Sequence, residues 1–250
     1  ILITSGGTKI PIDSVRHIAN MSKGTFGAAI CKAFLRQGHE VDFLTAENAK
    51  TPFELRLKYN EDEKLQNELY LEEQFERWQK FVHANKERYH EYTYRCFGDY
   101  VFELHKLFSK TQYDIVILAA AVSDYTVENA VSGKIRTADD MTIGLKPLPK
   151  VISTVREKQP NTFLVGFKLL VNSLDHELIE AAKQSIVSNK CDMVVANDLR
   201  DIKQDNHRLL LVEPSKEPVS EVQVFEKKTC KMPLAEKLVE RILFSKESKA

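Results

Sequence analysis

Glycines and small polar residues near the start of the chain form the first group that could do chemistry. A short apolar run ends at Gly6-Gly7-Thr8, and a second turn, Ser22-Lys-Gly-Thr-Phe-Gly27, opens a helix-like run. A turn of this kind leaves main-chain N–H groups unpaired at a helix N-terminus, where they can bind phosphate. The spacing differs from the GxGxxG dinucleotide fingerprint, because the loop is longer and holds a polar side chain, Asn20. The segment therefore predicts a phosphate-binding loop that also offers an amide.

Polar residues follow further apolar runs at the point where each run ends. Asp124 comes shortly after the run 115–121, and Asn197 follows the run 192–196. Ligands of an open parallel sheet bind above the carboxyl ends of the strands. We therefore expect the glycine loop, Asp124 and Asn197 to share one crevice.

Lysines add positive charge near the same strand ends. Lys134 lies in Gly133-Lys-Ile-Arg136, soon after the central apolar run. In that place it could neutralise phosphate charge or the oxyanion of an acyl transfer. Lys146, Lys150 and Lys168 lie near neighbouring strand and loop ends, where they would attract a phosphorylated ligand.

Alternating strand and helix patterns must position these residues. Strands are expected over 1–5, 41–45, 92–97, 115–121, 162–167 and 192–196, and helices over 26–37, 100–109, 151–158, 175–188 and 234–244. Residues 208–212 and 222–225 read as an antiparallel pair at one edge. This order predicts an α/β fold, with a doubly wound, mainly parallel, Rossmann-like sheet and an antiparallel edge.

One segment, about 51–90, interrupts the alternation. It has no glycine, is dense in charged and aromatic residues, and carries Leu65, Leu69, Phe75, Trp78 and Phe81 at roughly helical spacing. We expect one or two amphipathic helices inserted between strands, with a solvated charged face. Residues 1–250 are treated as a single domain that carries this helical insertion.

The composition narrows the classes of function. The 250 residues are 43% hydrophobic with a net charge of zero, which predicts no nucleic-acid partner. No apolar run approaches the roughly 20 residues of a membrane span, and no signal peptide is visible, so we expect a cytoplasmic protein without a membrane partner. The cysteines lack CxxC spacing and the histidines lack HxxxH spacing, which predicts reduced cysteines and no structural metal site.

Five motifs then occur in a recognisable order. They are residues 4–27, Ala119-Ala-Ala-Val-Ser-Asp-Tyr125, Gly133-Lys-Ile135, Val165-Gly-Phe-Lys-Leu-Leu170 and Val194-Val-Ala-Asn-Asp198. Together they resemble the phosphopantothenoylcysteine synthetase family, the ligases of coenzyme A biosynthesis, and they cover nearly the whole chain outside 51–90. The resemblance implies a monofunctional synthetase without the flavin-dependent decarboxylase domain that many bacteria fuse to it, and therefore no flavin.

The resemblance implies two half-reactions. The carboxylate of 4′-phosphopantothenate attacks the α-phosphate of CTP or ATP, with Mg²⁺, and gives an acyl-nucleotidylate and pyrophosphate. The amino group of L-cysteine then displaces the nucleotide monophosphate and forms the amide. Members of the family are homodimers, and a homodimer is expected here. The nucleotide base stays open, because Leu148-Pro-Lys-Val151 departs from the bacterial Asn-Pro-Asp-Ile toward the eukaryotic pattern; we favour CTP.

The resemblance also implies roles for single residues. Asn20 and Lys134 would be catalytic, Asn20 by holding the acyl carbonyl and Lys134 by stabilising the phosphate and the tetrahedral oxyanion. Arg16, Asn20 and Asn197 would bind substrate. The residues that would bind the nucleotide are Gly7, Ser22, Gly24, Gly27, Ala119, Ala120, Ala121, Asp124, Lys150, Phe167 and Lys183. Ser185 and Asn189 stand where bacterial members carry two lysines, and Lys183 and Lys190 are displaced nearby.

Two other functions stay open on the residues alone. A nicotinamide-dependent reductase is supported by Glu47, an acidic residue after the second strand, and opposed by the missing GxGxxG. A non-catalytic nucleotide-binding protein could use the aromatic-rich insertion to dock a partner.

Overall fold

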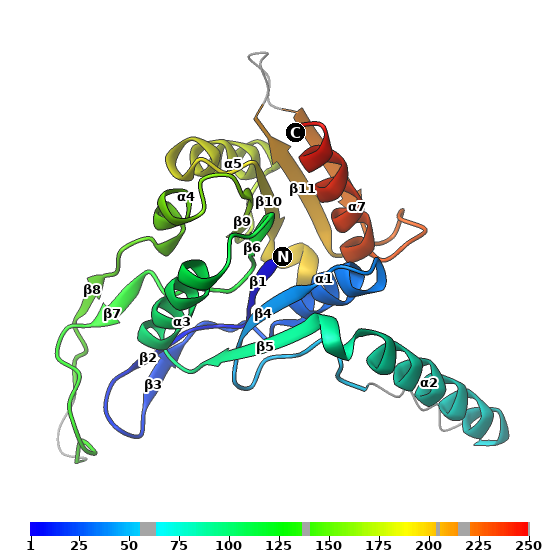
Figure 1. The fold of residues 1–250 in the computed structure, drawn as a ribbon. Coiled ribbons are helices and arrows are strands. Elements are labelled where there is room, and N and C mark those ends of the chain that lie inside the picture. Colours follow the sequence, from blue (N-terminus) through cyan, green and yellow to red (C-terminus); the bar gives the residue numbers. More distant parts are fainter. Residues whose placement is uncertain (56–63, 137–140, 204–205, 215–220, 250) are drawn as a thin grey trace.

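A central sheet organises the molecule (Figure 1). The computed structural model describes residues 1–55, 64–136, 141–203, 206–214 and 221–249. The strands of the sheet are β1 (Leu2–Ser5), β4 (Val41–Ala46), β5 (Tyr89–Tyr94), β6 (Ile115–Leu118), β9 (Phe163–Leu170), β10 (Met193–Asp198), β11 (Arg208–Glu213) and β12 (Glu221–Glu226). Their order in space is β12-β11-β10-β9-β6-β1-β4-β5.

The pairing of these strands confirms the predicted sheet. Every neighbouring pair from β5 across to β10 is parallel. The pairs β10–β11 and β11–β12 are antiparallel and form one edge. All four residues of β6 are buried, as expected of a central parallel strand that is covered on both faces.

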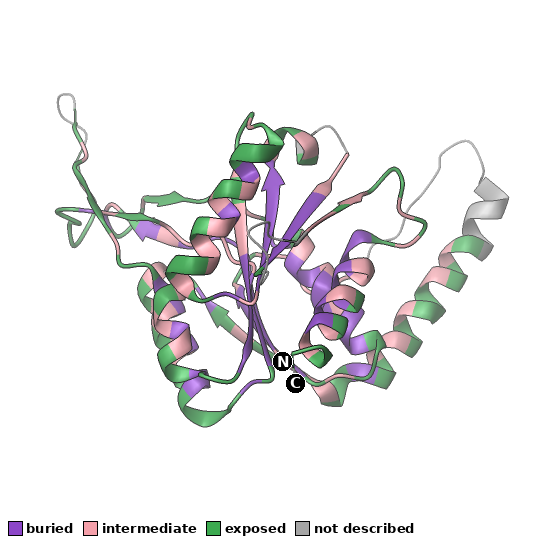
Figure 2. Ribbon diagram, turned by 90° about the horizontal axis from the view of Figure 1, so that it is seen from above, coloured by how far each residue is buried: buried purple, intermediate pink, exposed green. Residues whose placement is uncertain are grey.

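Helices cover both faces of the sheet, whose strands are seen as a buried layer between them in Figure 2. The helices α1 (Thr25–Arg36) and α7 (Leu234–Glu247) lie on one face, where Phe34 and Leu238 share a core with Ile3. The helices α3 (Phe97–Lys110), α4 (Val155–Lys158) and α5 (Asp175–Asn189) lie on the other, where Leu104 shares a core with Leu2. Successive strand side chains point to opposite faces, so Leu2 and Ile3 belong to different cores.

The helical insertion contains one described helix, α2 (Lys64–Asn85), which projects from the body in Figure 1. Trp78 anchors it by donating from Nε1 to the Phe53 carbonyl oxygen at 2.7 Å. The insertion was expected over about 51–90, and β5 begins at the end of that range, where Tyr89 pairs with Val41 in the sheet. Residues 56–63 and the side chains of Leu65 and Leu69 lie outside the described part of the chain.

Some element boundaries also differ from prediction. β5 lies three residues before the expected 92–97, and α3 consequently begins at Phe97 instead of Tyr100. β6 ends at Leu118, because Ala121 has left the sheet to form a bridge with Gly7. Short helices complete the described elements: η1 (Lys86–Arg88), η2 (Val151–Thr154) and α6 (Leu199–Lys203).

Two small hairpins were not predicted from the sequence. One pairs β2 (Lys9–Pro11) with β3 (His17–Ala19), and the other pairs β7 (Tyr125–Val127) with β8 (Leu145–Pro147). The two lie side by side at the same end of the molecule (Figure 1), where β2 contacts β7. All four cysteines are free, as predicted. None of the described helices has the length and apolar character needed to cross a bilayer.

Candidate active site

The first glycine loop is paired with the chain that leaves β6. Gly6 has a φ of 84°, a left-handed conformation that favours glycine. Its carbonyl oxygen accepts from the Ala121 N–H at 2.8 Å, and the Ala121 carbonyl oxygen accepts from the Thr8 N–H at 3.1 Å. The Thr8 hydroxyl donates to Ser123 Oγ at 3.0 Å, across 115 residues of sequence. The glycine loop of residues 6–8 and the segment 121–123, which belong to two of the predicted motifs, therefore form one wall of the candidate site.

The second glycine turn places the N-terminus of α1 against β1. Gly24 has a φ of 70°, and its carbonyl oxygen accepts from the Ser5 hydroxyl at 3.1 Å. A Cβ on Gly27 would lie 2.4 Å from that hydroxyl oxygen, so only glycine allows this approach. The first turn of α1 has no acidic residue, and its N-cap is Gly24, which has no side chain to cap the first N–H groups of the helix. The N–H groups at this end are thus suited to an anion.

Asn20 lies beside the glycine loop. Its side-chain Nδ2 donates to the Ala121 carbonyl oxygen at 2.9 Å, and its own carbonyl oxygen accepts from the Ser22 N–H at 2.8 Å. A Cβ on Gly7 would lie 2.6 Å from that carbonyl oxygen. The Asn20 side chain is otherwise exposed. The structure therefore brings Gly7, Asn20, Ser22 and Ala121 together.

Arg16 and Lys134 lie on the two loops next to this wall. The Arg16 guanidinium binds other protein groups, Asp13 through Nε at 3.0 Å and the Ile135 carbonyl oxygen through Nη2 at 2.6 Å. The Lys134 side chain is exposed, and no hydrogen bond or ion pair joins it to the described residues. Arg16 is thus engaged in holding the loop, whereas Lys134 is available to a ligand.

Asp124 and Lys150 form an ion pair across the base of the β7–β8 hairpin. The hairpin brings them together, because the Leu148 N–H donates to the Asp124 carbonyl oxygen at 2.8 Å. Both side chains are more than half exposed. An exposed pair of this kind contributes about 0–1 kcal/mol, so a ligand can separate the two groups at small cost.

An aromatic cluster that was not predicted from the sequence lies in the carboxyl-terminal halves of β9 and β10. The Phe26 ring meets the predicted residue Phe167 at 6.2 Å and His207 at 4.7 Å, both edge to face. The Asn197 amide nitrogen lies 2.9 Å from His207 Nε2, and an amide NH₂ can only donate, so Nε2 is the acceptor. Burial, with Lys227 nearby, lowers the pKa of His207 below its usual value. This neutral histidine orients Asn197.

His207 could have been found from topology. It precedes β11, an antiparallel strand whose beginning lies at the same edge as the carboxyl ends of β9 and β10. No periodicity or motif marks it, so only the strand order points to this position.

The remaining predicted residues are more dispersed. Ala119 follows β6, and the Ala120 N–H donates to the Thr4 hydroxyl at 3.2 Å, close to the shared wall. Lys183 lies on α5, where it pairs with Glu180 at 3.0 Å; no described hydrogen bond or ion pair links it to the other predicted residues. Ser185 and Asn189 are bonded to each other on the same helix.

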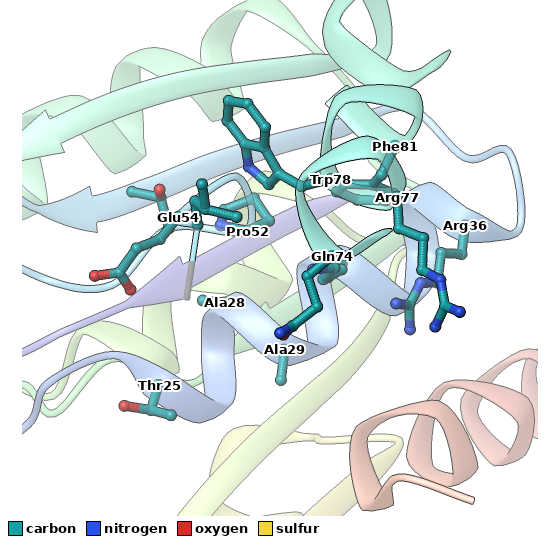
Figure 3. A pocket seen from close by; sticks show the side chains of 13 residues that line it. Thr25, Ala28, Ala29, Arg36, Pro52, Glu54, Gln74, Arg77, Trp78 and Phe81 are labelled. Carbon is teal, nitrogen blue, oxygen red and sulfur yellow. The ribbon is translucent and has the colours of Figure 1, made fainter. Parts of the chain in front are cut away.

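Two surface pockets lie outside the predicted set. One of about 350 Å³ lies between α1 and α2, and its lining includes Thr25 of α1 and Trp78 and Phe81 of α2. Figure 3 shows Gln74 of α2 reaching toward Ala29 of α1. The other, of about 380 Å³, includes Glu47 and Arg95. Glu47 pairs with Arg95 at 3.6 Å, so the acid that supports a nicotinamide cofactor already has a cationic partner.

Comparisons with known proteins show the family of this chain. Residues 1–68 and 103–244 match the family described as DNA/pantothenate metabolism flavoprotein C-terminal domain. The coenzyme A biosynthesis bifunctional protein CoaBC of Thermococcus kodakarensis is 31% identical over 212 residues, which are 85% of this chain and 44% of that protein. This chain therefore spans less than half the length of that relative. Phosphopantothenate–cysteine ligase 2 of Oryza sativa subsp. japonica is 27% identical over 256 residues, 90% of this chain and 78% of that protein.

A solved structure gives the same assignment. The DNA/pantothenate metabolism flavoprotein of Streptococcus pneumoniae has a TM-score of 0.73 and 27% identity to this chain, with 100% of this chain and 98% of that chain covered. The internal stretch that the family leaves unmatched, 69–102, holds most of α2 and all of β5. The matched residues carry the glycine loop, Asn20, Ala121 and Lys134. The chain belongs to the DNA/pantothenate metabolism flavoprotein C-terminal domain family.

Proposed function

We propose that this chain is a phosphopantothenate–cysteine ligase, which joins 4′-phosphopantothenate to L-cysteine through an acyl-nucleotidylate and cleaves CTP or ATP to the monophosphate and pyrophosphate. One observation carries the proposal. The Asn20 amide binds the Ala121 carbonyl across 101 residues of sequence, and so joins two motifs at one wall beside the glycine loop. The name of the rice relative, a phosphopantothenate–cysteine ligase, supports the same reaction.

Charge is the main obstacle in the first half-reaction, because a carboxylate must approach a polyanionic nucleotide. The N–H groups at the start of α1 would bind phosphate oxygens, favoured by the positive end of the helix dipole. Lys134 and Lys150 would add positive charge. Lys150 would exchange Asp124 for phosphate, an exchange made easy by the exposure of that pair.

The second half-reaction needs a donor for the acyl oxygen as negative charge develops on it. An amide NH₂ carries two N–H donors. One N–H of Asn20 binds the Ala121 carbonyl oxygen, which fixes the orientation of the amide, and the other is left to bind the acyl oxygen. Loss of one such donor typically costs about 10²–10³-fold in kcat.

Mg²⁺ is proposed to enter with the nucleotide. The described residues include no group of three or more His, Cys, Asp or Glu that could hold a metal. Mg²⁺ commonly binds through substrate phosphates, one or two carboxylates and water, and the exposed carboxylate of Asp124 fits such a shell. Bound Mg²⁺ would neutralise phosphate charge. We also propose a cytoplasmic homodimer, without flavin, nucleic-acid partner or membrane partner.

Pyrophosphate release tests the reaction and the nucleotide base together. Purified protein is supplied with Mg²⁺, 4′-phosphopantothenate and either CTP or ATP, with and without L-cysteine. We expect pyrophosphate only when 4′-phosphopantothenate is present, and amide only when cysteine is added. Absence of pyrophosphate with both nucleotides would refute the ligase. Nucleotide binding without turnover would favour a non-catalytic protein, and tight binding in an NADH or NADPH titration would favour a reductase.

Asn20→Ala tests the site. Because the amide would act on the acyl oxygen, this variant should accumulate acyl-nucleotidylate and form amide slowly. Asn161→Ala is the matched control, since Asn161 is exposed and precedes β9 at the opposite edge of the sheet. Wild-type amide formation by Asn20→Ala would remove this residue from its role.

A further inference from the structure

A buried carboxylate outside the predicted set, that of Asp13, joins the turn between β2 and β3 to the loop that carries Lys134. Its side chain is 0% exposed. One oxygen accepts from the main-chain N–H groups of Val15 at 2.8 Å and Arg16 at 2.7 Å. The other accepts from Arg16 Nε at 3.0 Å and from the Ile135 N–H at 3.1 Å, 122 residues away. A single carboxylate therefore connects two loops.

Both neighbours of Lys134 are held by the same turn. The Gly133 N–H donates to Ser14 Oγ at 2.8 Å, and the Ser14 N–H donates to the Gly133 carbonyl oxygen at 3.0 Å. On the other side of Lys134, the Ile135 carbonyl oxygen accepts from Arg16. The main chain is fixed on each side of the lysine, while its side chain stays exposed.

The chemistry of these contacts requires a carboxylate. Hydrogen bonds from the Val15 N–H, and then from Arg16 and Ile135, hold the pKa of Asp13 well below its usual range, so the group is ionised at neutral pH. Asn at this position would keep one acceptor oxygen, and its NH₂ group would face N–H donors in place of the second. The Arg16 guanidinium compensates the Asp13 charge, which leaves the Lys134 charge available for an anion.

We propose that Asp13 is a positioning residue that holds Lys134 at the active site. The inference rests on the proposed ligase function, in which Lys134 stabilises phosphate and oxyanion charge. Asp13 acts through the main chain of 133–135 and itself touches no substrate.

The test compares Asp13→Asn with Asp114→Asn, whose side chain is 81% exposed at a distance from both loops. Trypsin cleavage after Lys134 in the ligand-free protein reports on the loop. We expect Asp13→Asn to be cut there about 10-fold faster, because release of the loop raises the population of the open form. Cleavage elsewhere should stay within about twofold of the control.

The same variants are assayed for turnover. We expect the kcat of Asp13→Asn to fall by about 10-fold or more with little change in the nucleotide KM, the result of losing an interaction made in the transition state. A fold that is merely weakened would show faster cleavage at many sites. Ser14→Ala, an exposed position, should give smaller changes in the same direction, and it carries the test if Asp13→Asn does not fold.

Two results would overturn the inference: cleavage after Lys134 at the control rate, or faster cleavage with wild-type kcat. An inactive wild-type protein would instead refute the proposed ligase. In that case the cleavage rates alone would still decide whether Asp13 holds the loop.

Discussion

Replacement of Gly7 by Ala should slow catalysis far more than it destabilises the fold. The new Cβ would lie 2.6 Å from the carbonyl oxygen of Asn20, short of an ordinary 3.4 Å contact by about 0.8 Å. A main-chain oxygen cannot rotate out of the way as a side chain can. The chain at Asn20 must therefore shift by most of an ångström, or the glycine loop must shift by the same amount.

The displacement falls on the group that is proposed to hold the acyl oxygen. The Asn20 amide is oriented by its 2.9 Å bond to the Ala121 carbonyl, and its own carbonyl accepts from Ser22 at 2.8 Å. A misplacement of about 1 Å can cost about 10²-fold in rate, so we expect kcat to fall by about 10- to 100-fold. Overpacking should cost about 1–3 kcal/mol of unfolding free energy.

The assay is amide formation under saturating substrates, with urea unfolding of the same preparation. Gly98→Ala is the matched control, because a Cβ there meets nothing nearer than the Cys96 sulfur at 3.8 Å. It should keep wild-type kcat and lose no stability, since Gly98 lies in the first turn of α3, where Ala stabilises a helix by up to about 1 kcal/mol relative to Gly. If Gly7→Ala turns over at the wild-type rate, or loses activity only in proportion to its unfolded fraction, the close contact with Asn20 does not control the reaction.

Three further outcomes concern stability, each measured as unfolding free energy in urea. Gly27→Ala should be destabilised, since its Cβ would lie 2.4 Å from a serine hydroxyl of β1. Overpacking costs about 1–3 kcal/mol, which exceeds the roughly 1 kcal/mol that Ala gains over Gly in a helix. A Gly27→Ala variant as stable as the wild type would contradict this. Burial lowers the pKa of His207 from 6.5, so the unfolded chain binds more protons than the folded chain, and stability should decline as pH falls below about 6.5. His207→Gln should make that decline with pH shallower. An unchanged slope would exclude His207 as the source of the decline. Phe34→Ala, fully buried, should lose about 3–5 kcal/mol, whereas Phe102→Ala, at a side chain that is 65% exposed, should change by less than about 0.5 kcal/mol.

The parallel strands at the centre of the sheet could be predicted because their apolar sequences suit few other structures. The run Ile115–Leu118 is apolar at every position, which suits a strand buried on both faces, and the structure places it in the middle of the sheet. The start of β5 was harder to predict. Tyr89–Tyr94 mixes tyrosines with polar residues without strict alternation, and it follows the charged and aromatic α2 without a glycine or proline to separate them. Composition alone therefore does not show where the helical segment ends and β5 begins.

The hairpins could not be predicted because long-range contacts hold them. The strands β2 and β3 have three residues each, and all three residues of β3 are exposed, so no hydrophobic periodicity exists there. Their position depends on pairings such as the Val131 N–H with the Ile12 carbonyl oxygen at 3.1 Å. Asp13 was not predicted for the same reason. An Asp three residues before an Arg is common in ordinary turns, and only the hydrogen bond from the Ile135 N–H, far along the chain, distinguishes this one.

The architecture separates the source of stability from the source of chemistry. Buried side chains of the sheet, such as Phe43 and Val165, supply most of the hydrophobic stabilisation but offer no donor to a ligand. The groups that can meet a ligand, Asn20, Lys134 and Lys150, are exposed and belong to loops and hairpins outside that core. Hydrogen bonds between these loops must therefore fix the positions of these groups, as side-chain packing does in the core. A reactive group displaced by about 1 Å loses most of its effect on the rate. It follows that substitutions in the sheet should change unfolding free energy, while substitutions between the loops should change kcat.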